Sequence, residues 1–150
     1  MLRPIMVEMK QNPGIPRLIM GIGHHLKMRL DKKLSDDNLT ISQFRVLDYL
    51  WKHNEEKINQ KMIHEFLEIK PSSLTKLIRI LTIKGLIIQE ADPEDSRHRI
   101  IRLTEKGIKI KDICLQNIAE TEAYLLQDFS RQEISALTVF LLKIKKKIKH

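Results

Sequence analysis

Apolar residues change their spacing along residues 59–107, from a helical repeat to the short runs typical of strands. Two short helical patterns come first, and two apolar runs separated by a polar loop follow them. A new helix start then closes the segment. This order predicts two helices, a β-hairpin and a further helix, with the rest of the chain organised around them.

The second of these helices is predicted from about Pro71 to Lys84. Pro71 suits a first helical position, because its φ is already helical and its missing N–H is no loss. Gly85 stands where a left-handed residue commonly ends a helix, and Lys84 lies in the last turn, where a cation is favourable for the helix dipole. Four apolar residues recur at the i, i+3, i+4, i+7 spacing of one buried face. They are Leu74, Leu77, Ile78 and Leu81.

The hairpin is predicted from two β-branched apolar runs on either side of a polar loop. The runs are residues 86–88 and residues 100–103, and the loop extends from Glu90 to His98. The loop contains proline and aspartate, which favour turns. Thr104 followed by Glu105 indicates the start of the next helix. A helix-turn-helix followed by such a hairpin is a winged helix-turn-helix, whose second helix enters a DNA major groove.

The outer face of the second helix, at about 100° per residue, carries hydroxyl groups and long cations. Hydroxyls can bond phosphates or base edges, and lysine and arginine can reach guanine O6 and N7 or phosphates. The predicted DNA contacts on this helix are Ser72, Ser73, Thr75, Lys76 and Arg79. A solvated cationic face is the alternative interpretation of the helix taken alone.

The wing region resembles the MarR-type (multiple antibiotic resistance regulator) transcription factors. The similar segments are KGLI at 84–87, DPEDSR at 92–97 and LTEKG at 103–107. The family has an Asp-x-Arg pattern several residues before Leu-Thr, and Asp95 and Arg97 match it here. The resemblance implies that Arg97 enters the minor groove and that Asp95 supports the wing. A surface ion pair worth about 0–1 kcal/mol is the alternative for these two residues.

The resemblance extends from Leu39 to Gly107, close to half of the chain. Its first part is the pattern Leu-Thr-x-x-Gln-Phe-x-Val-Leu, which begins at Leu39, and within it Thr40 and Gln43 fit a capping box. Lys70 departs from the family, which often has a capping serine or aspartate there. The start of the recognition helix is therefore less well defined.

The helix before the recognition helix is predicted to begin after a capping Asn59. Its buried side is expected to include Met62, Ile63, Phe66 and Leu67. Lys57 and Ile58, just before it, are compatible with a short strand.

Helices are also predicted on both sides of this region. One runs from Pro16 to about Leu34, and a long one runs from Thr104 to about Asp128. Ser130 and Glu133 form a capping box that opens the last helix. The apolar residues of the last helix alternate spacings of three and four, as in a coiled-coil seam. They are Ile134, Leu137, Leu141, Ile144 and Ile148.

The predicted fold class is mainly α with a small β-hairpin wing, in one MarR-like domain over residues 1–150. The winged helix-turn-helix lobe is residues 39–107. Residues 14–37 and 108–150 form a helical dimerisation lobe, because the resemblance implies a homodimer built from the first and last two helices. Residues 1–13 have no firm pattern and are expected to form a loose arm.

The composition and charge of the chain favour some classes of function and argue against others. The formal net charge of +8 favours nucleic acid or another anionic partner, whereas an aromatic content of 5% argues against single-strand stacking platforms. No apolar run reaches the length of a membrane span, and the N-terminus lacks a signal-peptide pattern. The single Cys114 suits a reducing compartment, so a cytoplasmic location is expected. Cys114 itself is expected to be a small buried hydrophobe.

The sequence contains no nucleophile–base pair, glycine-rich phosphate loop or metal constellation, so no enzyme activity, cofactor or metal site is predicted. The predicted function is a regulator, most simply a repressor, that binds double-stranded DNA at a pseudo-palindromic operator as a homodimer. MarR-type proteins often release DNA in response to a small aromatic anion or an oxidant. His25 and Arg29, near the crevice between the first, second and long helices, are candidates for an effector site. The alternative is a protein-interaction winged helix that uses its basic face for an acidic partner.

Overall fold

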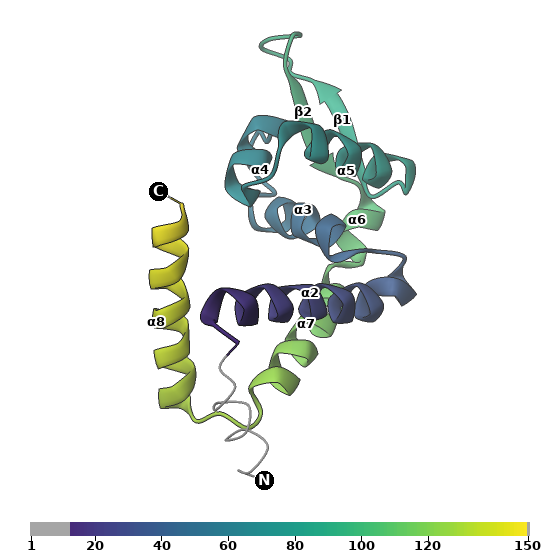
Figure 1. The fold of residues 1–150 in the computed structure, drawn as a ribbon. Helices are drawn as coiled ribbons and strands as arrows, with labels where there is room; N and C mark the ends of the chain where they lie inside the picture. Colours follow the sequence, from purple (N-terminus) through teal and green to yellow (C-terminus); the bar gives the residue numbers. More distant parts are fainter. Residues whose placement is uncertain (1–12, 150) are drawn as a thin grey trace. The chain divides into compact units, whose positions relative to one another are not determined.

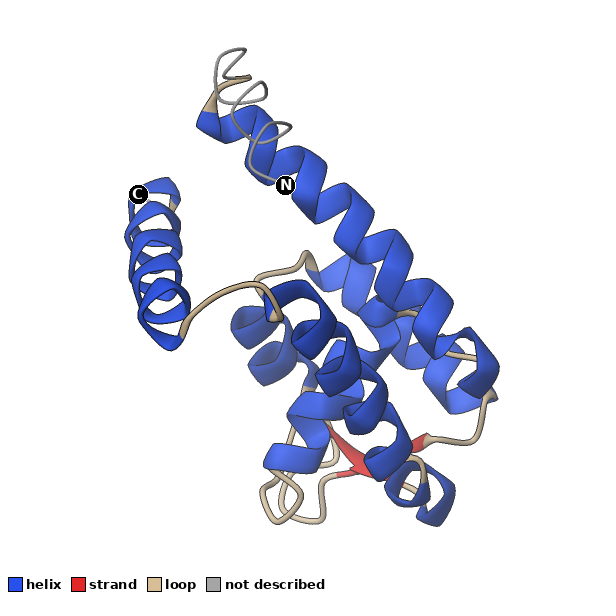
Figure 2. Cartoon of the chain, turned by 90° about the horizontal axis from the view of Figure 1, so that it is seen from below, coloured by secondary structure: helices blue, strands red, loops and turns tan. Residues whose placement is uncertain are grey.

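The computed structural model describes residues 13–149, which are mainly helical with one β-hairpin (Figures 1 and 2). The predicted fold class is therefore confirmed. The predicted N-terminal arm lies outside the described residues, apart from Pro13. The elements in chain order are α2 (Ile15–Leu34), the 3₁₀ helix η1 (Ser35–Asp37), α3 (Ile41–Lys52), α4 (Gln60–Leu67), α5 (Pro71–Ile83), β1 (Ile87–Ala91), β2 (Arg99–Leu103), α6 (Glu105–Lys109), α7 (Lys111–Leu126) and α8 (Arg131–Ile148).

The chain divides into two compact units, Met1–Cys114 and Leu115–His150. The first unit contains α2 to α6 and the start of α7, and the second contains the rest of α7 and α8. The predicted division groups the first helix with the last two instead. That grouping describes an assembled dimer and stays a prediction.

The core of the first unit is built from α3, α4, α5 and the hairpin. Of the predicted inward face of α5, Leu74, Ile78 and Leu81 are fully buried, and Leu77 is half-buried. Burial of such side chains stabilises the fold by about 1.5–3 kcal/mol each. The Trp51 indole N–H donates to the Gly107 carbonyl at 2.9 Å and joins α3 to α6. The side chains that α3 buries include Phe44, Val46, Leu47, Leu50 and Trp51.

The helix starts that were predicted from capping residues are present as capped N-termini. The Thr40 hydroxyl accepts from the Gln43 N–H at 3.2 Å, and the Gln43 side chain accepts in return from the Thr40 N–H at 3.3 Å. Asn59 caps α4 through the Met62 N–H, also as predicted. The remaining capped starts are at Thr104 for α6 and at Ser130 for α8.

The predicted hairpin is present, and its strands, Ile87–Ala91 and Arg99–Leu103, are longer than the predicted runs. The two strands pair antiparallel with Ile87 opposite Leu103 and Ala91 opposite Arg99, so the wing loop is residues 92–98. Leu86 is buried just before the first strand. The predicted short strand at Lys57 and Ile58 is wrong. Ile58 contributes only a carbonyl, which accepts from the Ile101 N–H at 2.8 Å.

Two other local predictions are wrong. Phe66 is 62% exposed, because the narrow buried face of α4 is centred on Ile63 and Leu67. The Phe66 ring instead lies against the buried Tyr49 of α3, at a centroid distance of 4.9 Å. The long helix expected from Thr104 is interrupted at Ile110, whose ψ of −4° lies away from the α-helical value of about −42°. No proline or terminal glycine marks that position in the sequence.

Candidate nucleic-acid interface

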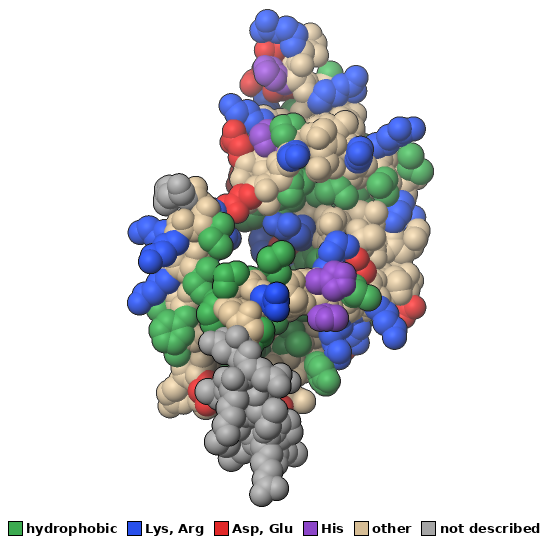
Figure 3. Space-filling view, in the orientation of Figure 1, with side chains coloured by type: hydrophobic (Ala, Val, Ile, Leu, Met, Phe, Trp, Pro, Cys, Tyr) green, Lys and Arg blue, Asp and Glu red, His purple; other side chains and the backbone are tan. Residues whose placement is uncertain are grey.

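The outward side of α5 is polar and cationic. Ser72, Ser73, Thr75, Lys76 and Arg79 are all exposed, and the buried residues of α5 point to the opposite side. Lysine and arginine side chains are distributed over the surface around α5 and the wing (Figure 3). The structure therefore brings together the five residues predicted on this helix, in an orientation that an approaching nucleic acid can reach.

The C-terminal end of α5 is attached to the start of α3. Lys84 Nζ donates to the Gln43 side-chain oxygen at 2.8 Å and to the Asn38 carbonyl. Partial burial lowers the pKa of Lys84. Gly85 has a φ of 71°, the left-handed conformation predicted for it, and the Leu86 N–H closes the helix end by donating to the Leu81 carbonyl at 3.0 Å. These contacts fix the orientation of the helix.

The N-terminal end of α5 is less tightly held. Lys70 occupies the N-cap position and makes no side-chain capping hydrogen bond. The missing cap agrees with the sequence, in which Lys70 stands where the MarR-type family often has a capping serine or aspartate. Thr75 Oγ1 donates to the Pro71 carbonyl at 3.0 Å and lies 3.3 Å from the Gln60 side-chain oxygen, which places one flank of α5 beside the start of α4.

The wing loop holds Arg97 through Asp95. Arg97 Nε and Nη2 donate to the two carboxylate oxygens of Asp95, each at 3.0 Å, and the Arg97 backbone N–H donates to the same carboxylate at 3.1 Å. These bonds lower the pKa of Asp95 and raise that of Arg97. The Arg97 side chain remains 87% exposed. Asp95 thus orients Arg97 at the protein surface without covering it.

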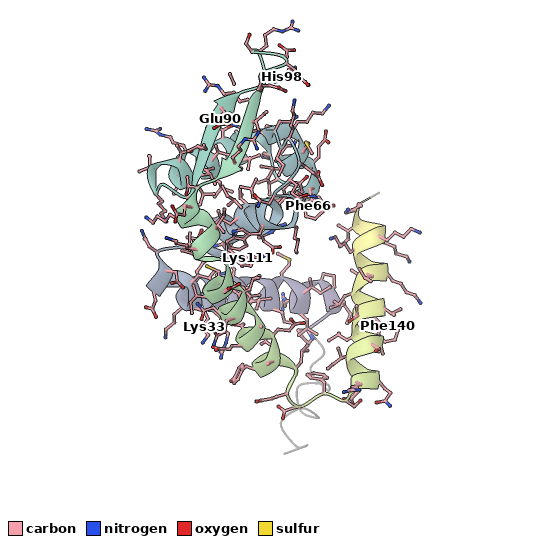
Figure 4. All side chains as sticks on the ribbon, turned by 180° about the vertical axis from the view of Figure 1, so that it is seen from behind. Lys33, Phe66, Glu90, His98, Lys111 and Phe140 are labelled. Atoms are coloured by element: carbon pink, nitrogen blue, oxygen red, sulfur yellow. The ribbon has the colours of Figure 1, made fainter. Side chains whose placement is uncertain are left out.

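The wing carries ion pairs that the sequence pattern did not indicate. Lys57 Nζ lies 3.4 Å from Asp92 and 2.9 Å from Glu94, and Arg102 pairs with Glu90 at 3.1 Å. A hydrogen bond from the Glu94 N–H is the main cause of a lowered pKa of Asp92. Figure 4 labels Glu90 on strand β1 and His98 in the distal part of the wing. Because Lys57 precedes α4, it joins the wing to the helix-turn-helix.

The candidate effector residues lie on α2. His25 and Arg29 are both exposed, and the His25 ring stands edge-on to His24 at a centroid distance of 5.4 Å. The predicted crevice extends to the long helix, which spans both compact units, so the effector site stays a prediction. Within residues 13–149, no group of three or more histidine, cysteine, aspartate or glutamate side chains is placed to hold a metal ion.

Cys114 is fully buried, as predicted, and burial raises the pKa of its thiol to about 11. The thiol stays protonated at neutral pH, and the thiolate is the reactive form. We expect the folded protein to resist alkylation by iodoacetamide at pH 8 and to be modified rapidly once denatured. Mass spectrometry of both samples measures this, and rapid modification of the folded protein would contradict the assignment.

The arrangement described above is that of a winged helix-turn-helix, with α4 and α5 as the helix pair and the β1–β2 hairpin as the wing. The family model for the transcriptional regulators SarA/Rot matches residues 29–113. The chain belongs to the SarA/Rot family of transcriptional regulators. This result confirms the predicted MarR-type resemblance and the class of transcription regulator.

Similar proteins include other regulators of transcription. The regulator SarZ of Staphylococcus haemolyticus is 37% identical over 78 residues. The match covers 52% of this chain and 52% of SarZ, so the chain spans about half the length of that relative. The regulator MhqR of Bacillus subtilis is 27% identical over 131 residues, covering 87% of this chain and 86% of MhqR. The structure of MepR of S. aureus in complex with DNA has a TM-score of 0.85 and 28% identity, covering 89% of this chain and 98% of MepR.

The comparisons favour a DNA-binding regulator over the protein-interaction module that the sequence left as the alternative. The matched family consists of transcriptional regulators and not of enzymes. Among the residues described here, no helix is long and apolar enough to cross a membrane.

Proposed function

We propose that this chain binds double-stranded DNA sequence-specifically, with α5 in the major groove and the wing against the backbone or minor groove. The observation that carries the proposal is the exposed row of hydroxyls and cations on α5, on a helix fixed at its C-terminal end by Lys84. Arg97, held by Asp95 on the wing, supplies a second contact. The similarity to MepR, whose structure is a complex with DNA, supports the same arrangement.

We further propose that the chain acts as a homodimer on a pseudo-palindromic operator. Two-fold symmetry would place two copies of α5 in successive major grooves, about 34–36 Å apart. The support within one chain is α8, where Leu137, Leu141 and Ile148 are exposed along one side. Val139, Phe140 and Leu142 of α8 are exposed as well, and Figure 3 shows hydrophobic side chains along this helix. An exposed apolar stripe of this kind marks a surface that another protein copy covers.

Repression is the mode of regulation we propose, because a dimer bound across a promoter blocks access to it, and the cytoplasm is the proposed location. A small-molecule or oxidant effector that acts near His25 and Arg29 is a further part of the hypothesis. The support for it is the accessibility of both residues on α2.

Selection of bound duplexes from a random pool tests the proposed function. A pseudo-palindromic consensus is expected, with affinity that falls steeply as salt rises. Recovery of duplexes without a common sequence would contradict sequence-specific binding. A matched control is the double variant Lys146→Gln and Lys147→Gln on α8, which is expected to keep both affinity and preference, since these residues lie outside the proposed interface.

The wing provides a second prediction. Arg97→Ala should weaken binding to the selected duplex by about 1–3 kcal/mol, because a groove contact is lost, while the fold and the dimer persist. Arg99→Ala, at an exposed strand position beside the loop, is the control. Binding isotherms at moderate salt measure the effect. Superimposable curves for the wild type and Arg97→Ala would show that the wing does not contribute.

A further inference from the structure

A basic hollow of about 590 Å³ lies beside the recognition helix. Its walls come from the start of α3, from the turn between α4 and α5, and from one flank of α5. The lining residues are Ser42, Arg45, Leu67, Ile69, Lys70, Ser73, Lys76 and Leu77. Of these described lining residues, three are cationic and none is acidic, so the hollow has a positive potential.

Arg45 is positioned by the protein itself. Its Nη2 donates to the Leu67 carbonyl at 3.1 Å, near the end of α4 and 22 residues along the chain. A planar guanidinium has five N–H donors in a fixed geometry, and a carbonyl occupies only one of them. The remaining donors stay available for a tetrahedral anion, for which arginine geometry is well suited. The contact with Leu67 therefore restricts the orientation of Arg45 before any ligand arrives.

The hollow divides the outer side of α5 into two parts. Lys76 lines the hollow, whereas Arg79 does not. The two residues are three positions apart, so their side chains project about 60° from each other around the helix axis. Thr75 lies on the other flank, beside Gln60. Lys76 therefore leans toward Arg45 and Lys70, and Arg79 lies between Lys76 and Thr75 around the helix, away from the hollow.

We propose that this hollow receives a backbone phosphate of the DNA whose major groove α5 enters, with Arg45, Lys70 and Lys76 as its ligands. In helix-turn-helix proteins the helix before the recognition helix crosses the DNA backbone, and the end of that helix, α4, lines the hollow at Leu67. A DNA phosphate fits better than a small free anion, because all three cations are exposed, whereas a small-molecule site encloses most of its ligand. The proposal rests on the proposed function and deepens it. Lys76 becomes a positioning contact, and base discrimination falls to Arg79 with Ser72 and Thr75.

The test compares binding to the selected operator and to a scrambled duplex at several salt concentrations. Arg45→Gln should weaken both complexes by the same factor, about tenfold, because a charged hydrogen bond to a phosphate is lost. The slope of log affinity against log salt should become less steep by about 0.9, the value for one phosphate. Arg45→Lys should restore much of the slope. Lys52→Gln is the control, since Lys52 lies on the same helix and pairs with Asp48 at 2.7 Å.

Because Arg45 also contacts the Leu67 carbonyl within the fold, two further variants test the proposal without changing Arg45. Lys70→Gln and Lys76→Gln should also weaken both duplexes alike, and thermal unfolding verifies that each variant is folded. Arg79→Gln should change the preferred sequence instead. The proposal is overturned if Arg45, Lys70 and Lys76 variants match the wild type, or if they change base preference. Failure of the wild type to bind any duplex would instead contradict the proposed function.

A titration with inorganic phosphate at constant ionic strength distinguishes the two sources of phosphate. Under the proposal, phosphate displaces the operator from the wild type no more strongly than chloride does. Strong displacement that is lost in Arg45→Gln would identify a site for a free anion and overturn the assignment to DNA.

Discussion

Leu141→Asp is expected to abolish the dimer and to leave a monomeric or largely unfolded protein. Leu141 lies on the apolar side of α8 and is 48% exposed in the single chain. Five apolar side chains form the stripe, and their burial contributes about 8–15 kcal/mol as an upper bound. An aspartate at its centre would place a carboxylate without a partner in the interface, on both copies at once.

Sedimentation at micromolar concentration measures the assembly state, and circular dichroism measures the fold. Lys143→Asp is the matched control, because it introduces the same carboxylate about 200° around α8 from Leu141. That variant should remain dimeric. A wild type that sediments as a well-folded monomer would refute the dimer, and a dimeric Leu141→Asp would place the interface elsewhere. Phe140, which is also exposed on α8 (Figure 4), would then be the next residue to substitute.

The elements of the interface were predictable because their signals are local. Thr40 with Gln43, Asn59 and Thr104 each form hydrogen bonds within three residues along the chain, so the capping patterns identify the helix starts directly. The buried side of α5 follows from apolar spacing alone. Because that spacing places the apolar residues on one side of α5, Lys76 and Arg79 lie on the opposite, exposed side.

The features that the sequence did not indicate depend on distant residues. Lys84 and Gln43 are 41 positions apart, and Arg45 and Leu67 are 22 apart, so no local pattern connects them. Phe66 was predicted on the buried side of its helix together with Met62, Ile63 and Leu67. Its exposure follows from the narrow contact surface of α4, which only the packed structure defines. Similarly, the carbonyl of Ile58 accepts a hydrogen bond from β2, although the segment around Ile58 does not form a strand.

The contact between the wing and α6 is close enough to explain the glycine at position 107. The Gly107 N–H donates to Thr104 Oγ1 at 3.1 Å, and its carbonyl accepts from Trp51 at 2.9 Å. A Cβ placed here would overlap the Leu86 carbonyl oxygen, and it would lie 3.1 Å from the Leu86 carbonyl carbon. Backbone atoms cannot rotate away as a flexible side chain can. Any larger residue therefore has to displace either the start of β1 or α6.

Gly107→Ala sets two effects against each other. In an exposed helix the substitution stabilises by about 1 kcal/mol, because alanine is the better helix former. Here the overlap with the Leu86 backbone is an overpacking that costs about 1–3 kcal/mol, and weakening the Trp51 bond adds about 1 kcal/mol. Because α6 is only a short helix (Glu105–Lys109), the propensity gain is small. We expect a net loss of about 2 kcal/mol in the free energy of unfolding, or about 4–8 °C in Tm.

Thermal unfolding of Gly107→Ala and Lys109→Ala measures this balance on one helix. Lys109 is exposed and makes a surface pair with Glu105 at 2.9 Å, so its removal should change Tm little. A Tm for Gly107→Ala equal to or above that of the wild type would mean that the wing moves freely with respect to α6. Since the same contact sets where β1 begins, a destabilised Gly107→Ala should also bind the operator more weakly. Arg97 and Asp95 stay chemically intact in that variant, so weaker binding would come from the displaced wing alone.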